Sequence, residues 1–243
     1  MAEIGSAYNL GEAEGGELPQ GQLMWSPRIG FNYDLTGNKT DVLRGGIGIF
    51  TSRVPFVWPG GAYANNGITI GGVDEDDIEA DIIFNPDPNS QLTNESFTIP
   101  SGQVDLFSKD FRYPQVLRAS LGYDKTFRNG WSGGIEGIYT KTLNNVFYQN
   151  VNSDPTIGFT WTGGPDDRQV FTRTSIDPAY TAIYLGTNTS EGYTYNFTVN
   201  AAKNFDFGLN FFAAYTFGNA RSIFEGTSSQ NSSQWRGAFT VNG

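Results

Sequence analysis

Apolar and polar residues alternate along residues 22–53, and this alternation predicts β-strands with one apolar face. From residue 22 to 35 the odd positions carry Leu23, Trp25, Pro27, Ile29, Phe31, Tyr33 and Leu35. After a polar turn at 36–40, a second run again places its large aliphatic residues at odd positions, with Phe50 as the exception. Two alternating runs joined by a short polar turn predict a β-hairpin at 22–53.

The same alternation returns twice further along the chain. It predicts a second hairpin at 116–148, with a tight Arg-Asn-Gly turn at 128–130, and a third hairpin at 191–219. Trp235 begins another alternating run, for which we expect a strand over 235–243. The segments between hairpins are far longer than the roughly four to six residues that usually connect strands. We therefore expect short turns at one end of a sheet and long loops at the other.

Composition supports strands and excludes several kinds of site. Glycine (31), phenylalanine (19) and tyrosine (12) are abundant and only 16% of residues are charged, which suits strands and turns better than helices. The net charge of −10 argues against a nucleic-acid partner. The sequence contains no histidine and no cysteine, so it offers no imidazole or thiol for catalysis, metal binding or disulfide formation.

Two sequence features bear on the cellular location of the chain. No apolar run approaches the roughly 18 residues of a membrane-spanning helix, which argues against a helical membrane protein. Residues 1–20 lack the basic and apolar regions of a signal peptide. Either the protein stays inside the cell, or the chain is an internal piece of a longer exported protein.

Two architectures fit the alternation: a soluble antiparallel sandwich and a transmembrane β-barrel. The barrel is favoured because the polar positions are mainly glycine, serine, threonine and asparagine, and because short turns oppose long loops. Aromatic residues near strand ends, as in membrane-interface girdles, are Trp25, Trp131, Tyr123, Tyr139, Tyr193 and Tyr195. We expect an all-β, antiparallel, up-and-down barrel segment of about six or seven strands, with odd side chains facing lipid and even side chains facing an aqueous lumen.

Three stretches of the sequence indicate a particular family. "SPRIGFNYDLTGNKTDVLRGGIGIFTSRVPFVW" at 26–58, "FRYPQVLRASLGYDKTFRNGWSGGIEGIYTKTLNNVFYQNVN" at 111–152 and "SSQWRGAFTVNG" at 232–243 resemble the barrel of TonB-dependent outer-membrane receptors of the Oar-like group. The resemblance covers most of the chain from about Gln22 onward. In that family a signal peptide, a TonB-box segment and a plug domain accompany a barrel of about 22 strands.

The resemblance implies that residues 22–243 are part of such a barrel and that residues 1–21 are the end of a preceding extracellular loop or linker. The chain would then lie in the outer membrane of a Gram-negative bacterium. Its partners would be membrane lipid, the plug domain and TonB, through the full-length receptor, and a surface lipoprotein. The long loops would capture an oligosaccharide, a peptide or a siderophore, which the complete barrel would pass inward with energy delivered by TonB.

We expect no enzymatic activity, because no pair of acidic residues is distinguished by its spacing. We also expect no cofactor. Two other functions remain open. One is a surface-binding or adhesion β-protein that transports nothing. The other is a soluble β-sandwich that acts on carbohydrate.

Two groups of residues are candidates for a site. Aromatic side chains in the long loops can stack on sugars or anchor a peptide, although they can equally pack the loops together; these are Trp58, Tyr63, Phe159 and Trp161. Charged residues at even positions are predicted to face the lumen, where a charge needs water or a partner; these are Arg28, Arg44, Arg118 and Glu136. For them we favour contacts with one another or with the plug over contact with substrate.

An acidic run at 73–81 offers a weak candidate for calcium binding. Calcium prefers carboxylate oxygens, but the run lacks the spacing of an EF-hand loop, and acidic loop segments are usually solvated. The candidate ligands are Asp74, Asp76, Asp77 and Asp81.

Overall fold

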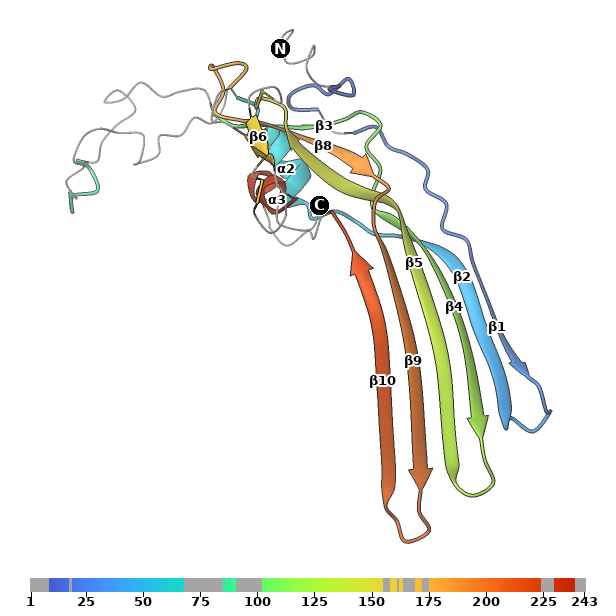
Figure 1. Cartoon of the computed structure of the whole chain (residues 1–243). Helices are drawn as coiled ribbons and strands as arrows, with labels where there is room; N and C mark the ends of the chain where they lie inside the picture. Colours follow the sequence, from blue (N-terminus) through green and yellow to red (C-terminus); the bar gives the residue numbers. More distant parts are fainter. Residues whose placement is uncertain are drawn as a thin grey trace.

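The computed structural model describes residues 9–17, 19–67, 85–90, 102–154, 158–160, 162–163, 169–171, 175–223 and 230–238. Six long strands lie side by side, and a group of helices and short strands lies at one end of them (Figure 1). The arrangement is all-β and antiparallel in its main sheet, as the sequence predicts.

Three hairpins build the long sheet, close to the predicted positions. Their strands are β1 (Arg28–Asp34), β2 (Asp41–Thr51), β4 (Gln115–Thr126), β5 (Trp131–Asn150), β9 (Tyr193–Asn204) and β10 (Asn210–Arg221). Every neighbouring pair in the order β1-β2-β4-β5-β9-β10 is antiparallel. We call these strands, with β5 up to Lys141, the long sheet.

The first strand is shorter than the alternation predicts. It begins at Arg28, so residues 22–27 lie outside it. Pro27 gives the reason, because proline has no backbone N–H to donate to a neighbouring strand. Its carbonyl still accepts a hydrogen bond from the backbone N–H of Ile49, at 2.9 Å.

The hairpin turns are short and lie together at one end of the long sheet (Figure 1). In the first turn the Asp34 carboxylate accepts the backbone N–H groups of Gly37 at 2.9 Å and Lys39 at 2.8 Å. In the other two, Gly130 and Gly208 have φ values of 76° and 93°, which glycine adopts without steric cost. The predicted contrast between short turns and long loops is confirmed.

The strand register separates odd from even residues over the full width of the long sheet. One row across the six strands contains Phe31, Gly45, Leu121, Gly137, Phe197 and Phe217. The neighbouring row contains Asn32, Arg44, Gly122, Glu136, Thr198 and Thr216. Since side chains alternate between faces along a strand, the odd residues share one apolar face and the even residues share one polar face.

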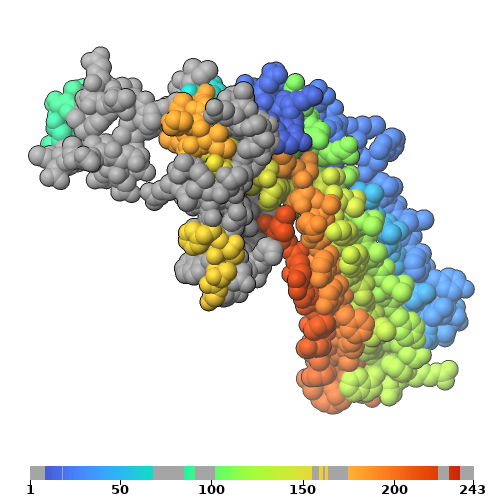
Figure 2. Space-filling view, turned by 45° about the horizontal axis from the view of Figure 1, so that its top comes forward, coloured from blue at the N-terminus to red at the C-terminus, as the bar shows by residue number. Residues whose placement is uncertain are grey.

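The apolar face is exposed. Ile29 is 73% exposed, Leu121 57% and Phe217 56%, although these are large hydrophobic side chains. Figure 2 shows the long sheet as one slab. Within the described residues no second sheet packs on either face of it. β1 and β10 each pair with one neighbour among the described strands, so the sheet is not closed. A soluble sandwich would bury this face, and that alternative is therefore not supported.

The described parts of the segments between and after the hairpins form a folded unit, which we call the loop body. It contains α2 (Val57–Ala64), β3 (Val104–Phe107), β8 (Ile183–Thr189), α3 (Asn231–Ala238) and the part of β5 beyond Lys141. β8 pairs with β5 from Asn145 to Asn150, and β3 pairs with β8 in parallel. A separate pair, β6 (Gly158–Thr160) and β7 (Gln169–Phe171), completes the described strands.

The buried core of the described residues lies in the loop body and not in the long sheet. One cluster gathers around Trp58 and Tyr148, whose rings meet edge to face at 5.8 Å. A second cluster contains Leu106, Ile183 and Leu185, each no more than 1% exposed. No helix within the described ranges has the length and hydrophobicity needed to cross a membrane.

The prediction of a strand that begins at Trp235 is wrong for the described part of that segment. Residues 231–238 form α3, and residues 239–243 lie outside the described residues. Asn231 and Gln234 are buried, and Trp235 packs against Tyr184 with ring centroids 5.7 Å apart. Residues 231, 234 and 235 have the i, i+3, i+4 spacing of one face of a helix. The alternation from Trp235 is too short to specify a strand.

Candidate functional site

The polar face of the long sheet carries a cluster of three charged residues. The Arg44 guanidinium on β2 donates to Asp124 Oδ2 on β4 at 2.7 Å and to Glu136 Oε1 on β5 at 2.5 Å. Gly122 lies between Arg44 and Glu136 in the register. A Cβ there would lie 3.0 Å from Arg44 Cζ, so glycine leaves room for the guanidinium to cross β4.

The two other predicted lumen residues lie on the same polar face. Arg28, Gly48 and Arg118 form one row near the ends of β1, β2 and β4 that adjoin the loop body. The Arg28 guanidinium lies 4.4 Å from the centroid of the Phe50 ring. Phe50, the exception to the alternation, is thus the aromatic partner of an arginine on the polar face. Arg118 has no ion pair with another described residue.

The structure thus brings all four predicted charged residues to one face and pairs two of them. Arg44 and Glu136 contact each other, whereas Arg28 and Arg118 lie in a row four residues further along the strands. The row between them carries mostly small side chains; it holds Gly30, Gly46, Ser120, Ile138, Asn196 and Gly218. A face of mostly small groups that also carries charged side chains suits contact with water.

A charged cluster on the apolar face was missed by the sequence analysis. Asp41, at the start of β2, accepts from Lys125 Nζ at 2.5 Å and from the Tyr123 hydroxyl. All three residues are odd-numbered and lie toward the hairpin turns. Asp41 lies opposite Lys125 only because β2 pairs with β4. The long segment 52–114 separates these two strands in the sequence, so the alternation within each strand does not reveal the pairing.

The predicted loop aromatics are not equivalent. Trp58 is 4% exposed and packs against Tyr148, as the packing alternative expects. Tyr63 on α2 and Phe159 on β6 are 57% and 60% exposed. Trp161 lies outside the described residues. Of the three described aromatics, Tyr63 and Phe159 present an exposed ring. Their contact with a ligand stays a prediction.

The calcium candidates Asp74, Asp76, Asp77 and Asp81 also lie outside the described residues. In the described parts of the chain, no group of three or more acidic side chains is arranged to hold a metal ion.

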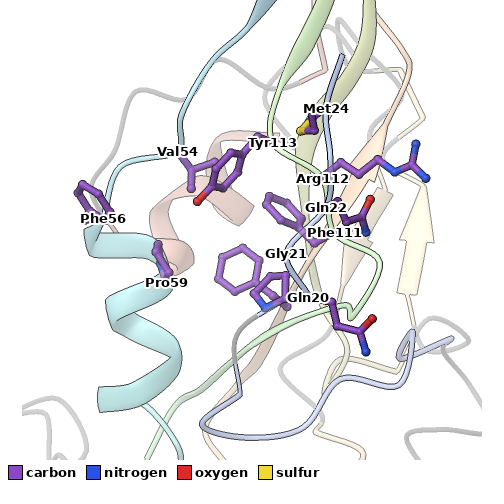
Figure 3. Close-up of a pocket in the computed structure, with 12 residues that line it drawn as sticks. Gln20, Gly21, Gln22, Met24, Val54, Phe56, Pro59, Phe111, Arg112 and Tyr113 are labelled. Atoms are coloured by element: carbon purple, nitrogen blue, oxygen red, sulfur yellow. The ribbon is translucent and has the colours of Figure 1, made fainter. Parts of the chain in front are cut away.

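An apolar cavity of about 310 Å³ lies where the loop body meets residues 19–24, which precede β1. Its walls include Phe56 and Pro59 on one side and Phe111 on another (Figure 3). Arg112 lines the cavity, but its guanidinium extends away from the aromatic residues (Figure 3). The cavity offers mainly hydrophobic contact.

Comparison with known proteins agrees with this geometry. The sequence model of a family described as "Outer membrane beta barrel domain" matches residues 11–242. No curated protein matches the sequence significantly. The family match covers nearly the whole chain, including the long sheet and the described loop body.

Proposed function

Since the chain belongs to the family of outer membrane beta barrel domains and lies in the outer membrane, we propose that it forms part of the wall and the outer loops of a TonB-dependent transporter. In this proposal the odd face of the long sheet contacts lipid. The even face lines an aqueous interior that a plug domain occupies. The loop body lies outside the cell and captures the nutrient.

The observation that carries the proposal is the separation of faces across the whole sheet. The odd row from Phe31 to Phe217 is apolar and exposed, and the even row beside it contains the Arg44–Glu136 pair. An exposed apolar face favours lipid as its neighbour. The polar face favours water and polar protein groups.

The open edges support a barrel larger than these six strands. An unpaired strand edge inside a membrane leaves backbone groups without partners, which costs several kcal/mol for each group. β1 and β10 each expose one edge among the described strands. Further strands that pair with both edges would satisfy these groups, in agreement with the resemblance to large receptor barrels.

The first experiment tests contact with TonB and needs no ligand. The protein is tagged at its chromosomal locus, cells are treated with formaldehyde, and proteins linked to the tagged chain are identified. We expect TonB among them, more strongly in energised cells than after collapse of the proton-motive force. Absence of TonB, with another known receptor recovering it under the same conditions, would contradict the proposal.

The second experiment separates transport from adhesion. Cells with and without the gene are given radiolabelled maltohexaose, trialanine or ferrichrome, with and without an uncoupler. A transporter accumulates its label only in energised cells that carry the gene. Gene-dependent binding that is equal with and without the uncoupler would favour the adhesion alternative.

A further inference from the structure

A second cavity, of about 410 Å³, lies inside the loop body between α2, β3 and the start of α3. Figure 1 shows the two helices next to each other below β3 and β8. The lining includes Gly60, Gly61 and Asn65 from the α2 region, Asp105 from β3, and Asn231 from α3. A volume of this size accommodates a small organic ligand.

The wall of this cavity contains a buried carboxylate that forms no ion pair with a described lysine or arginine. Asp105 is 1% exposed and accepts amide hydrogen bonds from Asn65 Nδ2 and Gln103 Nε2, each at 2.7 Å. None of the residues that line the cavity is a lysine or an arginine. Burial raises the pKa of the Asp105 carboxyl by more than the hydrogen bonds from Asn65, Gln103 and Asn231 lower it.

Asn231 supplies a second acceptor through its amide oxygen, while its side chain also hydrogen-bonds the Asp105 carboxylate. It is 3% exposed, and its Oδ1 atom has no hydrogen-bond partner within the described residues. A buried amide oxygen without a partner costs about 1–3 kcal/mol, so a bound donor would recover free energy there. Its Nδ2 atom lies near the carboxylate, because a Cβ built on Gly61 would be 3.2 Å from this nitrogen and 2.7 Å from Asp105 Oδ2.

We propose that this cavity binds a ligand through a primary ammonium group. An ammonium offers three donors and no acceptor, which matches an ionised carboxylate beside an unpaired amide oxygen. The positive charge compensates Asp105, whereas a neutral hydroxyl would leave the buried charge unpaired. Calcium fits less well, because it takes six to eight oxygen ligands and this wall offers one carboxylate.

The ammonium can be the amino terminus of a peptide or the end of a lysine side chain, and the experiment distinguishes them. Calorimetric titrations use the full-length protein in detergent with three probes at millimolar concentrations. Trialanine amide carries a free amino terminus, N-acetyl-lysine methylamide carries a side-chain ammonium, and N-acetyl-trialanine amide carries neither. We expect one or both of the first two probes to bind and the third to bind at least tenfold more weakly.

Two variants locate the binding. Asp105→Asn keeps the size of the side chain and removes its charge, and we expect at least a tenfold loss of affinity for the ammonium probe. Asp206→Asn makes the same change at an exposed residue in the β9–β10 turn and should leave the affinity unchanged. Equal unfolding temperatures without probe show that the variants are folded.

Several results would overturn the proposal. They are equal binding of the acetylated peptide, unchanged affinity in a folded Asp105→Asn variant, failure of both ammonium probes to bind, and displacement of the bound ammonium by millimolar calcium. Even where a variant does not fold, the comparison of the three probes on the unaltered protein tests whether binding requires an ammonium group. No outcome depends on TonB or on transport.

Discussion

Arg44 and Glu136 meet across an intervening strand, with Arg44 Nη1 2.5 Å from Glu136 Oε1 and Gly122 between them in the register. The pair therefore joins the first two hairpins on the polar face. Its side chains are 39% and 27% exposed, so water screens the attraction. We expect a modest contribution to stability from this pair, with a strong dependence on salt.

A double-mutant cycle measures this contribution. Arg44→Met and Glu136→Gln, alone and together, should show a coupling free energy of about 0.5–1 kcal/mol in urea unfolding from lipid vesicles, decreasing in high salt. Arg118→Met, combined with Glu136→Gln, is the control, because the two residues form no ion pair. Equal coupling in both cycles would contradict a specific Arg44–Glu136 contact.

The two faces of the long sheet should tolerate charge differently. Ile47→Arg places a cation on the apolar face and should cost about 2–4 kcal/mol if the residue lies near the bilayer midplane. Asn196→Arg places the same side chain on the polar face, where water can solvate it, and should cost far less. Both are measured in the full-length protein by equilibrium unfolding in vesicles. Similar costs would show that the odd face does not contact lipid.

Substitution of two aromatic residues of α2 should affect the stability of the loop body very differently. Trp58→Ala removes a side chain that is 4% exposed and should destabilise the loop body by about 3–5 kcal/mol. Tyr63→Ala removes a side chain that is 57% exposed and should change stability by less than about 0.5 kcal/mol. Hydrogen exchange of the amides of β3 and β8 provides the measurement. If Tyr63 contacts a ligand, its variant loses ligand affinity without losing protection from exchange.

Asp105 should make the loop body more stable in mild acid than at neutral pH. Its folded-state pKa is raised by burial, so folding favours the protonated carboxyl. The resulting stability is fully present below the unfolded-state pKa of about 3.9 and is lost as pH rises through the raised folded-state pKa. The difference in hydrogen-exchange protection between wild type and Asp105→Asn isolates this effect from other carboxylates. A difference that does not vary between pH 4 and pH 7 would contradict it.

The long sheet is predictable because its signals are local. Alternation within one strand places Ile29 and Ile47 on one face, and short turns fix each hairpin without knowledge of distant residues. The same parity predicts the shared face of Arg28, Arg44, Arg118 and Glu136. The partner of Arg44 at Asp124 is settled only once β2 and β4 pair.

The loop body is less predictable because its signals depend on distant contacts. The sequence of α2, VWPGGAYA, contains one proline and two glycines and has no helical pattern. All four residues of β3 are buried, so they show no alternation. Asp105 is one of many loop acids in the sequence, and its burial arises from contact with α2 and α3, which are distant along the chain.

β5 is one continuous strand of 20 residues that belongs first to the long sheet and then to the loop body. From Lys141 to Asn150 it extends by about 30 Å at the usual rise of a strand. Hydrogen bonds to β8 stiffen this extension, and no flexible linker interrupts it. The strand therefore connects the two units rigidly, so a tilt of the long sheet also tilts the loop body.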